Sequence, residues 1–404
     1  MHPCPTSPGV LMAHPSSELY GADRVMLETV EGLVQQGSRV VVTLPQTGPL
    51  VAELEERGAS VSLCPSPVLR KSSANPLGLL LLGLEAAKAS IHGLRLIRRT
   101  GPDVIYVSTL TIPLWLLLAR ISGLPVLAHV HEAEKSAKFP VRMGIIAPLI
   151  LAHRIITNSR YSAETLTDTL PALANRVRVV YNGVVGPDRV TAPREALTGP
   201  LQMVYVGRLS PRKGVDVAIA GVAEARRRGI EVSLDLVGAV YTGYEWYEEE
   251  LLSLATSLGM EEQIRFLGFC TDVWPNLAQA DVAIVPSRLD EPFGNTAVEA
   301  LLAARPLIVS DTSGLREAAG NYAAPVFVPA NDASAIADAI ELLHRDWSDY
   351  RRRALEDSLV AEERHRPSTY RSHVSQEIKE TAARKKSCRR KEIVQTQEST
   401  GARR

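Results

Sequence analysis

Short runs of β-branched and other apolar residues alternate with longer amphipathic stretches along most of the chain. This alternation is typical of an α/β fold, in which parallel strands are covered by helices. In the first half the pattern predicts strands at Val10–Ala13, Arg39–Thr43, Ser60–Leu63, Asp103–Val107, Val126–His131, Ile155–Thr157 and Val177–Val180. It predicts helices between them, for example at Ala22–Gln35, Leu77–Arg98 and Ser162–Leu170.

Residues 186–200 contain Gly and Pro but little apolar content, which indicates a linker. A second series of strands follows, at Met203–Val206, Val232–Val237, Ile264–Leu267, Val282–Val285, Leu307–Val309 and Val326–Val328. Two Rossmann-like halves of this kind enclose a cleft at the carboxyl ends of both sheets. We therefore expect the functional residues on the loops that follow strands.

The length of 404 residues fits about two domains. We expect an N-terminal Rossmann-like domain at residues 1–192 and a C-terminal one at residues 200–345. The sequence then becomes helical in pattern and strongly charged, which predicts C-terminal helices at residues 346–379. After Lys379 the apolar face is lost, so residues 380–404 are expected to form a basic, disordered tail.

The chain holds 45 basic and 45 acidic side chains, but their distribution is uneven. Residues 384–404 carry eight Lys or Arg and two Glu, which gives this segment a net charge of +6 and residues 1–383 a net charge of −6. An acidic body of this kind lacks the basic surface of a nucleic-acid-binding domain. We expect no nucleic-acid partner.

Three features bear on the compartment. The four cysteines are too far apart for a CxxC zinc or redox site, which indicates a reducing environment. The first apolar run, Val10–Ala13, is short and no Lys or Arg precedes it, unlike a secretory signal. The uncharged, largely apolar stretch Val104–Ala119 has 16 residues, fewer than the roughly 20 that span a bilayer. We expect a cytoplasmic protein.

Several nucleotide-binding and metal-binding motifs are missing from the sequence. No two glycines stand two residues apart, so a GxGxxG fingerprint is impossible, and no Gly-Lys pair exists for a Walker A loop. No two aspartates stand two residues apart either, so an Asp-x-Asp metal site is missing. These absences weigh against a dehydrogenase and a P-loop NTPase, and we expect neither a metal nor another cofactor.

A basic loop follows the strand predicted at Met203–Val206 and precedes a helix with an apolar face. It runs from Gly207 to Gly214 and contains Arg208 and Lys213. Free amides and the positive dipole at a helix start attract anions, and the two cations can add charge-assisted hydrogen bonds to a diphosphate. Alternatively both are solvated surface cations, and their spacing alone does not decide between these interpretations.

A second strand-loop-helix segment carries Glu291 and Glu299, which stand eight residues apart. Between them, Gly294 and Asn295 occupy positions where the backbone approaches a ligand or caps the helix. Carboxylates on a loop and an adjoining helix bind polyol hydroxyls well. Taken singly, Glu291 is more simply a solvated loop acid and Glu299 an acid that stabilises a helix N-terminus, but the basic loop favours a binding site.

Two histidines, His129 and His131, end a strand of the first half and project from one face of it. With Glu134 they could be metal ligands, although a third ligand at clear spacing is not evident. Two interpretations stay open: the histidines form a hydrogen-bonded structural pair, or His131 points into the cleft. Gly21, after the first strand, either leaves helix-start amides near the cleft or is an ordinary turn glycine.

In combination, these segments resemble the retaining glycosyltransferases of family 4. The resemblance rests on Gly207-Arg208-Leu209, on Lys213-Gly214, and on Glu291-Pro292-Phe293-Gly294 followed by Glu299, which has the E-x7-E spacing of that family. It covers roughly residues 9–345 and implies the GT-B fold, in which two Rossmann-like domains face each other across a cleft. Two positions depart from the family pattern. Where the family often has a turn of a small residue, Gly, any residue and Pro, this chain has Ala303-Ala304-Arg305-Pro306, and where it often has Gly-Gly, this chain has Tyr20-Gly21.

The resemblance implies that the C-terminal half binds a nucleotide-sugar donor and the N-terminal half binds the acceptor. The expected donor contacts are Arg208 and Lys213 on the diphosphate, Glu299 on the ribose, Glu291 on the sugar hydroxyls, the backbone of Phe293, Gly294, Asn295 and Thr296 on phosphate, and Gly268 and Phe269 near the base. In the N-terminal half, Gly21 is expected close to the diphosphate and His131 close to the transferred sugar.

Glu291, His131, Arg208 and Lys213 are the candidate catalytic residues under this resemblance. Cleavage of the sugar–phosphate bond builds negative charge on the leaving diphosphate, and fixed cations and helix-start amides stabilise that charge without a metal. In such enzymes retention is usually explained by front-face attack, in which a donor phosphate oxygen takes the acceptor proton. Glu291 need not be a covalent nucleophile.

We therefore expect a transferase that moves a sugar to a saccharide or lipid-linked acceptor, with a role in bacterial cell-envelope polysaccharide synthesis. The alternatives are a glycoside hydrolase that uses Glu291 and Glu299 as its acid and base, and a nucleotide-sugar-binding protein without turnover. Epimerases of the same fold are a more distant option. The apolar run at residues 143–151, beside Lys135, Lys138 and Arg142, predicts peripheral contact at the inner face of the membrane or, equally, a buried helix.

Overall fold

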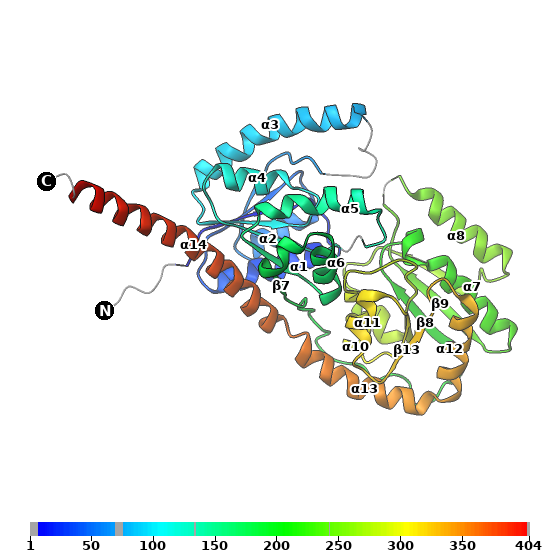
Figure 1. The fold of residues 1–404 in the computed structure, drawn as a ribbon. Coiled ribbons are helices and arrows are strands. Elements are labelled where there is room, and N and C mark those ends of the chain that lie inside the picture. Colours follow the sequence, from blue (N-terminus) through cyan, green and yellow to red (C-terminus); the bar gives the residue numbers. More distant parts are fainter. Residues whose placement is uncertain (1–6, 69–75, 133–134, 242, 402–404) are drawn as a thin grey trace. The chain divides into compact units, whose positions relative to one another are not determined.

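The computed structural model describes residues 7–68, 76–132, 135–241 and 243–401, without the side chains of residues 76–82 and 385–401. The chain forms two compact units, each with one parallel sheet (Figure 1). The first unit combines Met1–Gly183 with Pro367–Arg404, and the second is Val184–Arg366. The predicted α/β fold with two Rossmann-like parts is confirmed.

The sheet of the first unit has the strand order β3-β2-β1-β4-β5-β6-β7, which is that of a doubly wound Rossmann-like sheet. Its strands are β1 (Val10–Ala13), β2 (Val40–Leu44), β3 (Ser60–Leu63), β4 (Val104–Ser108), β5 (Val126–Val130), β6 (Arg154–Thr157) and β7 (Val177–Val179). Its helices are α1 (Gly21–Gln35), α2 (Pro49–Glu56), α3 (Pro76–Thr100), α4 (Leu114–Ile121), α5 (Phe139–Ile146), η2 (Ala147–Leu151), α6 (Arg160–Thr169), η3 (Pro171–Arg176) and α14 (Pro367–Gly401).

Helices on both faces of this sheet bury its side chains in two cores. Neighbouring residues of β1 point to opposite faces, so Leu11 packs in the core of Trp115 on α4, and Met12 in the core of Val30 on α1. A sheet covered on both faces requires apolar residues on both sides of its strands. This requirement explains the continuous apolar runs by which these strands are predicted.

The C-terminal helix α14 returns to the first unit after the chain has formed the second (Figure 1). Tyr370, Val374 and Ile378, at helical spacing, are buried in the same core as α1. Tyr370 Oη shares a hydrogen bond with Thr29 Oγ1 of α1 at 2.6 Å. The helix thus completes the hydrophobic core of the first unit.

This arrangement corrects the expected C-terminal organisation. The helices expected at residues 346–379 are present, but they divide between the units, since α13 (Trp347–Arg364) belongs to the second unit and α14 to the first. Residues 380–404 were expected to be disordered, whereas α14 continues as a helix to Gly401. Among the α14 residues whose side chains are described, Ala382 is the last one in the core, and the helix continues beyond it.

The sheet of the second unit has the order β10-β9-β8-β11-β12-β13, and all its pairings are parallel. Its strands are β8 (Leu201–Val206), β9 (Val232–Val237), β10 (Ile264–Gly268), β11 (Val282–Val285), β12 (Leu307–Ser310) and β13 (Pro325–Val328). Its helices are η4 (Pro211–Lys213), α7 (Val215–Arg227), α8 (Glu245–Ser257), α9 (Trp274–Gln279), α10 (Asn295–Leu302), α11 (Ser313–Ala319), α12 (Ala333–Arg345) and α13 (Trp347–Arg364).

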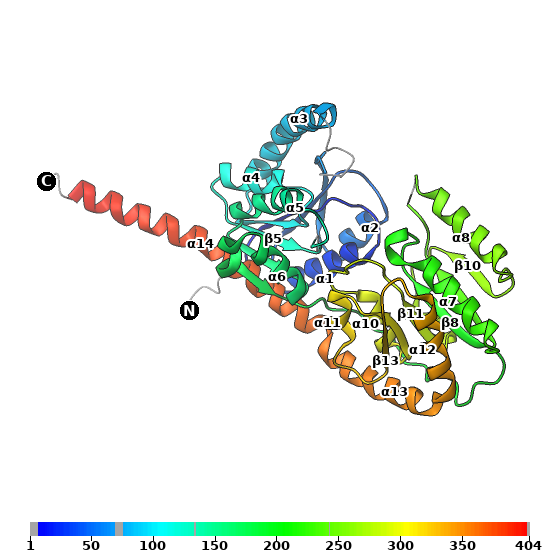
Figure 2. The ribbon, with the colours of Figure 1, turned by 45° about the vertical axis from the view of Figure 1, so that its right-hand side comes forward.

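Helices α7, α8 and α12 share one core with the strands of this sheet and cover one of its faces (Figure 2). Helices α9 and α10 contact strands of the sheet, and α13 packs against α10. The loops that lead from the strands into these helices lie at the carboxyl ends of the strands. This edge is where a doubly wound sheet binds its ligands.

The predicted linker at residues 186–200 contains neither helix nor strand, but it is fastened to the second unit. Arg194 Nε donates to Asp281 Oδ1 at 2.8 Å, and the buried Arg305 donates to the carbonyls of Thr191 and Ala280. These bonds explain why the second unit begins at Val184 and not at residue 200. Among the described helices, none has a long enough apolar stretch to cross a bilayer.

Candidate active site

Close backbone approaches define the path of the basic loop after β8. Gly207 has a φ of 145°, and Tyr205 Oη donates a hydrogen bond to the carbonyl of Arg208 at 2.7 Å. A Cβ on Gly238, after β9, would lie 1.8 Å from the Gly207 carbonyl oxygen, so a side chain does not fit there. The start of the basic loop therefore lies directly against the end of β9.

Gly214 ends the basic loop and turns it into α7. Its φ of 67° is in the left-handed region, and a Cβ would lie 2.1 Å from the Pro286 carbonyl oxygen. The Arg288 amide also donates to the carbonyl of Arg212 at 2.9 Å. These contacts hold the loop after β8 against the loop after β11, two segments that the sequence analysis singled out separately.

Lys213 and Glu291 meet where these two loops touch. Lys213 Nζ lies 3.0 Å from Glu291 Oε1, and Ser287 Oγ donates to the same oxygen at 2.9 Å. The side chain of Glu291 is 6% exposed and that of Lys213 is 27% exposed. The pair is thus a buried carboxylate with a cation that reaches the surface.

The charge of Glu291 is stabilised by its neighbours. Burial alone would raise the pKa of Glu291, but the charges of Lys213 and Arg212, with hydrogen bonds from Lys213 and Ser287, hold this pKa below its ordinary value. Burial, and then the charge of Glu291, raise the pKa of Tyr205 well above its ordinary value. At neutral pH Glu291 is therefore an acceptor and Tyr205 a neutral donor.

Arg208, the second predicted diphosphate ligand, lies against an aromatic ring. Its Cζ is 3.4 Å from the ring centroid of Tyr241, and its guanidinium donates a hydrogen bond to Tyr241 Oη. The negative face of the ring stabilises the cation. Tyr241 belongs to the loop after β9, and no motif in the sequence had marked it.

The loop after β11 enters α10 through Gly294. This glycine has a φ of 111°, and a Cβ would lie 2.5 Å from Leu315 Cδ2 of α11. Phe293 is 2% exposed, and its ring lies 5.8 Å from that of His365. The side chain of Phe293 is therefore buried, and the backbone contact with phosphate that the resemblance implies for this residue stays a prediction.

The first turns of α10 hold the remaining residues of the predicted phosphate and ribose contacts. Asn295, Thr296 and Glu299 are all partly exposed. Asn295 and Thr296 lie in the first turn of α10, at the positive end of the helix dipole, where anions are stabilised, and Glu299 lies one turn further along. Glu299 is less buried than Glu291, so the two carboxylates of the E-x7-E spacing have different environments.

The predicted base contacts, Gly268 and Phe269, follow β10. Gly268 has a φ of 70°, and its carbonyl accepts a hydrogen bond from the Gly238 amide at 2.7 Å. Phe269 is 46% exposed. The structure therefore brings the loops after β8, β9, β10 and β11 to one edge of the sheet of the second unit, and with them all the donor contacts predicted in this half.

In the first unit, His131 follows β5 and belongs to a cluster of rings. Its ring centroid is 4.0 Å from that of His129, so the two residues project from one face, as strand alternation predicts. His129 is fully buried, and its Nδ1 shares a hydrogen bond with Tyr106 Oη at 2.5 Å. The ring of Tyr370 on α14 lies 6.5 Å from that of His129 and belongs to the same cluster.

Both histidines are held neutral. Burial, and then the charge that His14 can carry, lower the pKa of His131 to about 3. Burial, and then His131, lower the pKa of His129 well below its ordinary value. His131 is the partly exposed member of the pair, so it can offer a ligand a neutral imidazole but no positive charge at neutral pH.

Gly21, the other predicted residue of this unit, is the exposed first residue of α1. Asp23 fixes this helix start, because its carboxylate accepts from the Tyr20 amide at 2.8 Å and pairs with His14 Nε2 at 2.7 Å. Asp23 and His14 had no predicted role. The capping-box spacing of an acid three residues into a helix is the signal that marks Asp23.

Glu132, next to His131, was also missed. It accepts hydrogen bonds from Thr109 Oγ1 and from the amides of Leu110 at 3.3 Å and His131 at 3.1 Å. Thr109 has a φ of 91°, which is rare for a β-branched residue. A strained residue held by a carboxylate is typical of functional sites, and no sequence motif reveals it.

Glu134, considered as a metal ligand beside His129 and His131, lies outside the described residues. Within residues 7–68, 76–132, 135–241 and 243–401, no group of three or more His, Cys, Asp or Glu side chains is arranged to hold a metal ion. Of the two ring nitrogens of His129, Nδ1 shares the hydrogen bond with Tyr106, and Nε2 is buried without a hydrogen-bond partner among the described residues.

Two family profiles match the chain. The profile of glycosyl transferases group 1 matches residues 191–358, and that of Glycosyltransferase Family 4 matches residues 20–185. This protein belongs to glycosyltransferase family 4. The profiles together include the basic loop, the Lys213–Glu291 pair, Gly21 and His131 of this family 4 protein.

Curated relatives of the family 4 protein include a glycogen synthase of Mycobacterium tuberculosis, 30% identical over 275 residues, which are 64% of this chain and 64% of that protein. A phosphatidyl-myo-inositol mannosyltransferase of Mycobacterium leprae is 30% identical over 253 residues, 60% of this chain and 64% of that protein. The matches thus span just under two thirds of the length of these relatives.

Among solved structures, Anabaena HepE in complex with UDP-glucose superposes on the family 4 protein with a TM-score of 0.79. The two chains are 22% identical, and the match covers 91% of this chain and 98% of HepE. This likeness supports the GT-B fold that the family resemblance implies.

Proposed function

We propose that this family 4 protein is a retaining, metal-independent glycosyltransferase that moves a sugar from a nucleotide-sugar donor to a saccharide or lipid-linked acceptor. This proposal rests on the ion pair between Lys213 and the buried Glu291. Lys213 Nζ and Glu291 Oε1 lie 3.0 Å apart, on the loops that lead into α7 and α10. The named relatives, a glycogen synthase and a mannosyltransferase, support a transfer of this kind. We place the reaction in bacterial cell-envelope polysaccharide synthesis, on the cytoplasmic side.

The chemistry of the proposal follows from the charges of the second unit. Lys213 Nζ can donate to a diphosphate oxygen while it remains paired with Glu291, since an ammonium has three donors. Arg208 and the helix-start amides of α10 add further donors on the same edge. As the sugar–phosphate bond breaks, these groups stabilise the negative charge on the leaving diphosphate, and the protein needs no metal ion for that step.

Glu291 has a different role in this scheme. Its carboxylate is ionised and fixed by Lys213 and Ser287, so it can accept hydrogen bonds from the hydroxyls of the donor sugar. In the first unit, the neutral His131 offers a hydrogen bond to the transferred sugar without adding charge. For a retained configuration, we propose front-face attack in which a donor phosphate oxygen takes the acceptor proton.

A glycoside hydrolase that uses Glu291 and Glu299 is less well supported. A hydrolase needs one carboxylic acid whose pKa is raised, so that it is protonated and can protonate the leaving group. The pKa of Glu291 is instead lowered by Lys213 and Arg212. A neutral glycan also gives the cations of the basic loop no phosphate to bind.

Donor binding tests the proposal. We expect one family of nucleoside diphosphates among UDP, GDP, ADP and dTDP, and its nucleotide-sugars, to raise the melting temperature of the wild type. At a hundred times its dissociation constant a ligand stabilises a protein by about 2.7 kcal/mol. Lys213→Ala is expected to lose this shift and to slow transfer roughly tenfold to a hundredfold, since it removes one charge-assisted hydrogen bond.

Two variants separate a lost ligand contact from a damaged fold. Lys213→Arg keeps the cation next to Glu291 and is expected to retain part of the shift. Lys88→Ala removes an exposed lysine of α3 in the other unit and is expected to retain all of it. A full shift and full turnover in Lys213→Ala would contradict the role of the basic loop, and no shift with any base would contradict the donor site.

We also propose peripheral contact of the first unit with a membrane. Phe139 and Val141 of α5 and Ile150 of η2 are each about half exposed, at 55%, 49% and 51%. Lys138 and Arg142 are cations on the same short segment. Exposed apolar side chains beside cations favour an anionic lipid surface. Co-flotation with anionic vesicles, but not with neutral ones, is expected, and its absence would remove this part of the proposal.

A further inference from the structure

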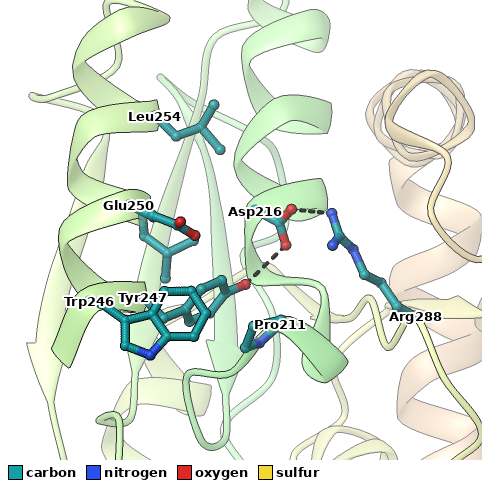
Figure 3. A pocket seen from close by; sticks show the side chains of 8 residues that line it. Pro211, Asp216, Trp246, Tyr247, Glu250, Leu254 and Arg288 are labelled. Carbon is teal, nitrogen blue, oxygen red and sulfur yellow. Dashed lines mark hydrogen bonds and ion pairs between the residues drawn. The ribbon is translucent and has the colours of Figure 1, made fainter. Parts of the chain in front are cut away.

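A pocket of about 350 Å³ opens in the second unit between α7 and α8 (Figure 3). Its walls are Pro211 of η4, Asp216 of α7, Arg288 of the loop after β11, and Trp246, Tyr247, Glu250, Leu251 and Leu254 of α8. None of these side chains is among the predicted donor contacts. The volume falls at the small end of the range for ligand pockets.

Most charges of this pocket are already paired. Asp216 forms an ion pair with Arg288 and accepts a hydrogen bond from Tyr247 Oη at 3.0 Å (Figure 3). Glu250 is exposed and has no hydrogen bond or ion pair to any of the described residues. The one acceptor that the pocket offers without an internal partner is therefore a carboxylate.

The apolar wall of the pocket is aromatic. Trp246 is 46% exposed, and its ring centroid lies 5.7 Å from that of Tyr247 and 6.1 Å from that of Tyr244. In Figure 3 the rings of Trp246 and Tyr247 lie side by side below Glu250. An exposed indole held by a second ring presents a large, rigid surface at low entropic cost.

These walls select the chemistry of the ligand. The pocket holds two carboxylates and one guanidinium, that of Arg288, which pairs with Asp216 although its Nε has no hydrogen-bond partner among the described residues. Because acids outnumber cations, the pocket disfavours an anion such as a phosphate. A purely apolar ligand would cover the indole but leave the carboxylate of Glu250 unused as an acceptor. A neutral sugar ring satisfies both walls, because its C–H face covers the indole while its hydroxyls donate to the carboxylate.

We propose that this pocket is a second carbohydrate subsite, which binds one neutral sugar unit of the glycan that the enzyme extends. The proposal rests on the transferase function above for the source of the glycan. Pro211 and Arg288 connect the pocket to the basic loop, since they flank Lys213 and Glu291 in sequence, and the Arg288 amide bonds to Arg212. The subsite thus lies next to the donor site but does not share its side chains.

Saturation-transfer NMR on the full chain tests the subsite. The probes are methyl α-glucoside, methyl α-mannoside, methyl α-galactoside, glucosamine and glucuronate, each with a saturating nucleoside diphosphate of the base that gives the thermal shift. We expect at least one neutral glycoside to bind, and Trp246→Ala to weaken it at least about tenfold, as for the loss of an aromatic anchor. Glu250→Gln is expected to weaken it several-fold, since one charged acceptor is lost.

The control is Leu252→Ala, which removes a 48% exposed residue of the same helix that does not line the pocket. It is expected to bind the neutral glycoside as the wild type does. Nucleoside diphosphate binding should be unchanged in all three variants, which separates this proposal from the donor site. Unchanged glycoside binding in Trp246→Ala, preference for glucosamine or glucuronate, or no sugar binding while the nucleotide binds would each overturn the subsite.

Discussion

The two units handle charge in opposite ways at their candidate sites. The second unit holds ionised side chains in fixed pairs, with Lys213 on the buried Glu291 and Arg288 on Asp216. The first unit holds neutral rings, because burial lowers the pKa of both His131 and His129, helped by His14 for His131 and by His131 for His129. The difference fits a division of labour in which one unit stabilises the charge of a diphosphate and the other positions neutral hydroxyls.

The two sites also differ in what fixes them. The second unit relies on glycines at close backbone contacts, such as Gly214 against Pro286 and Gly238 against Gly207. The first unit relies on side chains, since Asp23, Glu132 and Tyr106 each hold a neighbouring group by hydrogen bonds. Replacement of these glycines should therefore damage the second site most, whereas protonation of the buried histidines should damage the first site most.

The largest expected effect is that of Gly214→Ala. The new Cβ would lie 2.1 Å from the Pro286 carbonyl oxygen, at a φ of 67° that L-residues rarely adopt. We expect a loss of more than about 3 kcal/mol, because strain in the left-handed region and a backbone clash add together. Chemical denaturation measures the loss, and a thermal shift with nucleotide measures the donor site.

Gly229→Ala is the matched control for this substitution. Gly229 has a φ of 91°, but a Cβ there would meet no atom within 4 Å. Its cost should be limited to the backbone strain, about 1–2 kcal/mol. Equal losses in the two variants would mean that the contact of the basic loop with Pro286 does not hold the second site.

An intermediate effect is expected from pH in the first unit. The folded pKa of His131 is about 3, and that of an unfolded histidine is about 6.5. Between these values the unfolded chain binds a proton that the folded chain does not, so stability falls as pH decreases from about 6.5 to about 3. The loss from His131 alone is about 1.4 kcal/mol per pH unit.

Replacing His131 with Asn should remove this share of the pH slope, measured by denaturation from pH 6.5 to 5. The same change at the exposed His92 is the control and should leave the slope as it is. His129 and His153, whose pKa values burial also lowers, contribute to the slope in the same direction. A wild-type slope in His131→Asn would show that this histidine is not held neutral.

The second site should respond only to stronger acid. The folded pKa of Glu291 is lower than its ordinary value of 4.5, so its contribution to stability is present above that value and is lost as pH falls through the folded pKa. Hydrogen exchange resolved by unit separates the two responses. Between pH 6.5 and 4.5 we expect protection to fall around His131 before it falls around Glu291.

The sequence allowed the strands to be predicted with ends within two residues of the observed ones. This accuracy has a physical basis, because strands covered on both faces are short apolar runs with polar loops between them. Lys213 and Glu291 were both singled out, but their contact was not predicted. It depends on Gly214 meeting Pro286, an approach between segments more than seventy residues apart.

Other features had no local signal. Tyr241 under Arg208 and the strained Thr109 beside Glu132 depend on which loops the fold brings together. The unit boundary was misplaced because the segment at residues 186–200 has the composition of a free linker. Arg194 and Arg305 fasten it through bonds to Asp281 and to backbone carbonyls, and such long-range pairs are invisible in composition.

The smallest expected effect concerns Ala304, which stands where the family frequently has glycine. Its φ of 56° lies in the left-handed region, where an alanine is strained by about 1–2 kcal/mol. Ala304→Gly relieves that strain, but it adds about 0.4–1 kcal/mol of unfolded-state entropy and removes a buried methyl group worth about 0.8 kcal/mol. These terms nearly cancel, so the stability should change by less than about 1 kcal/mol and donor binding should not change.

Ala303→Gly provides the comparison that makes this near-cancellation visible. Ala303 is buried like Ala304 but has a φ of −78°, so glycine relieves no strain there. This variant should lose roughly 1–2 kcal/mol in chemical denaturation, from entropy and the lost methyl group together. If both variants lost the same amount, the left-handed strain at Ala304 would be absent. A smaller loss in Ala304→Gly would explain how this chain tolerates its departure from the family turn, since strain and burial offset each other at that one position.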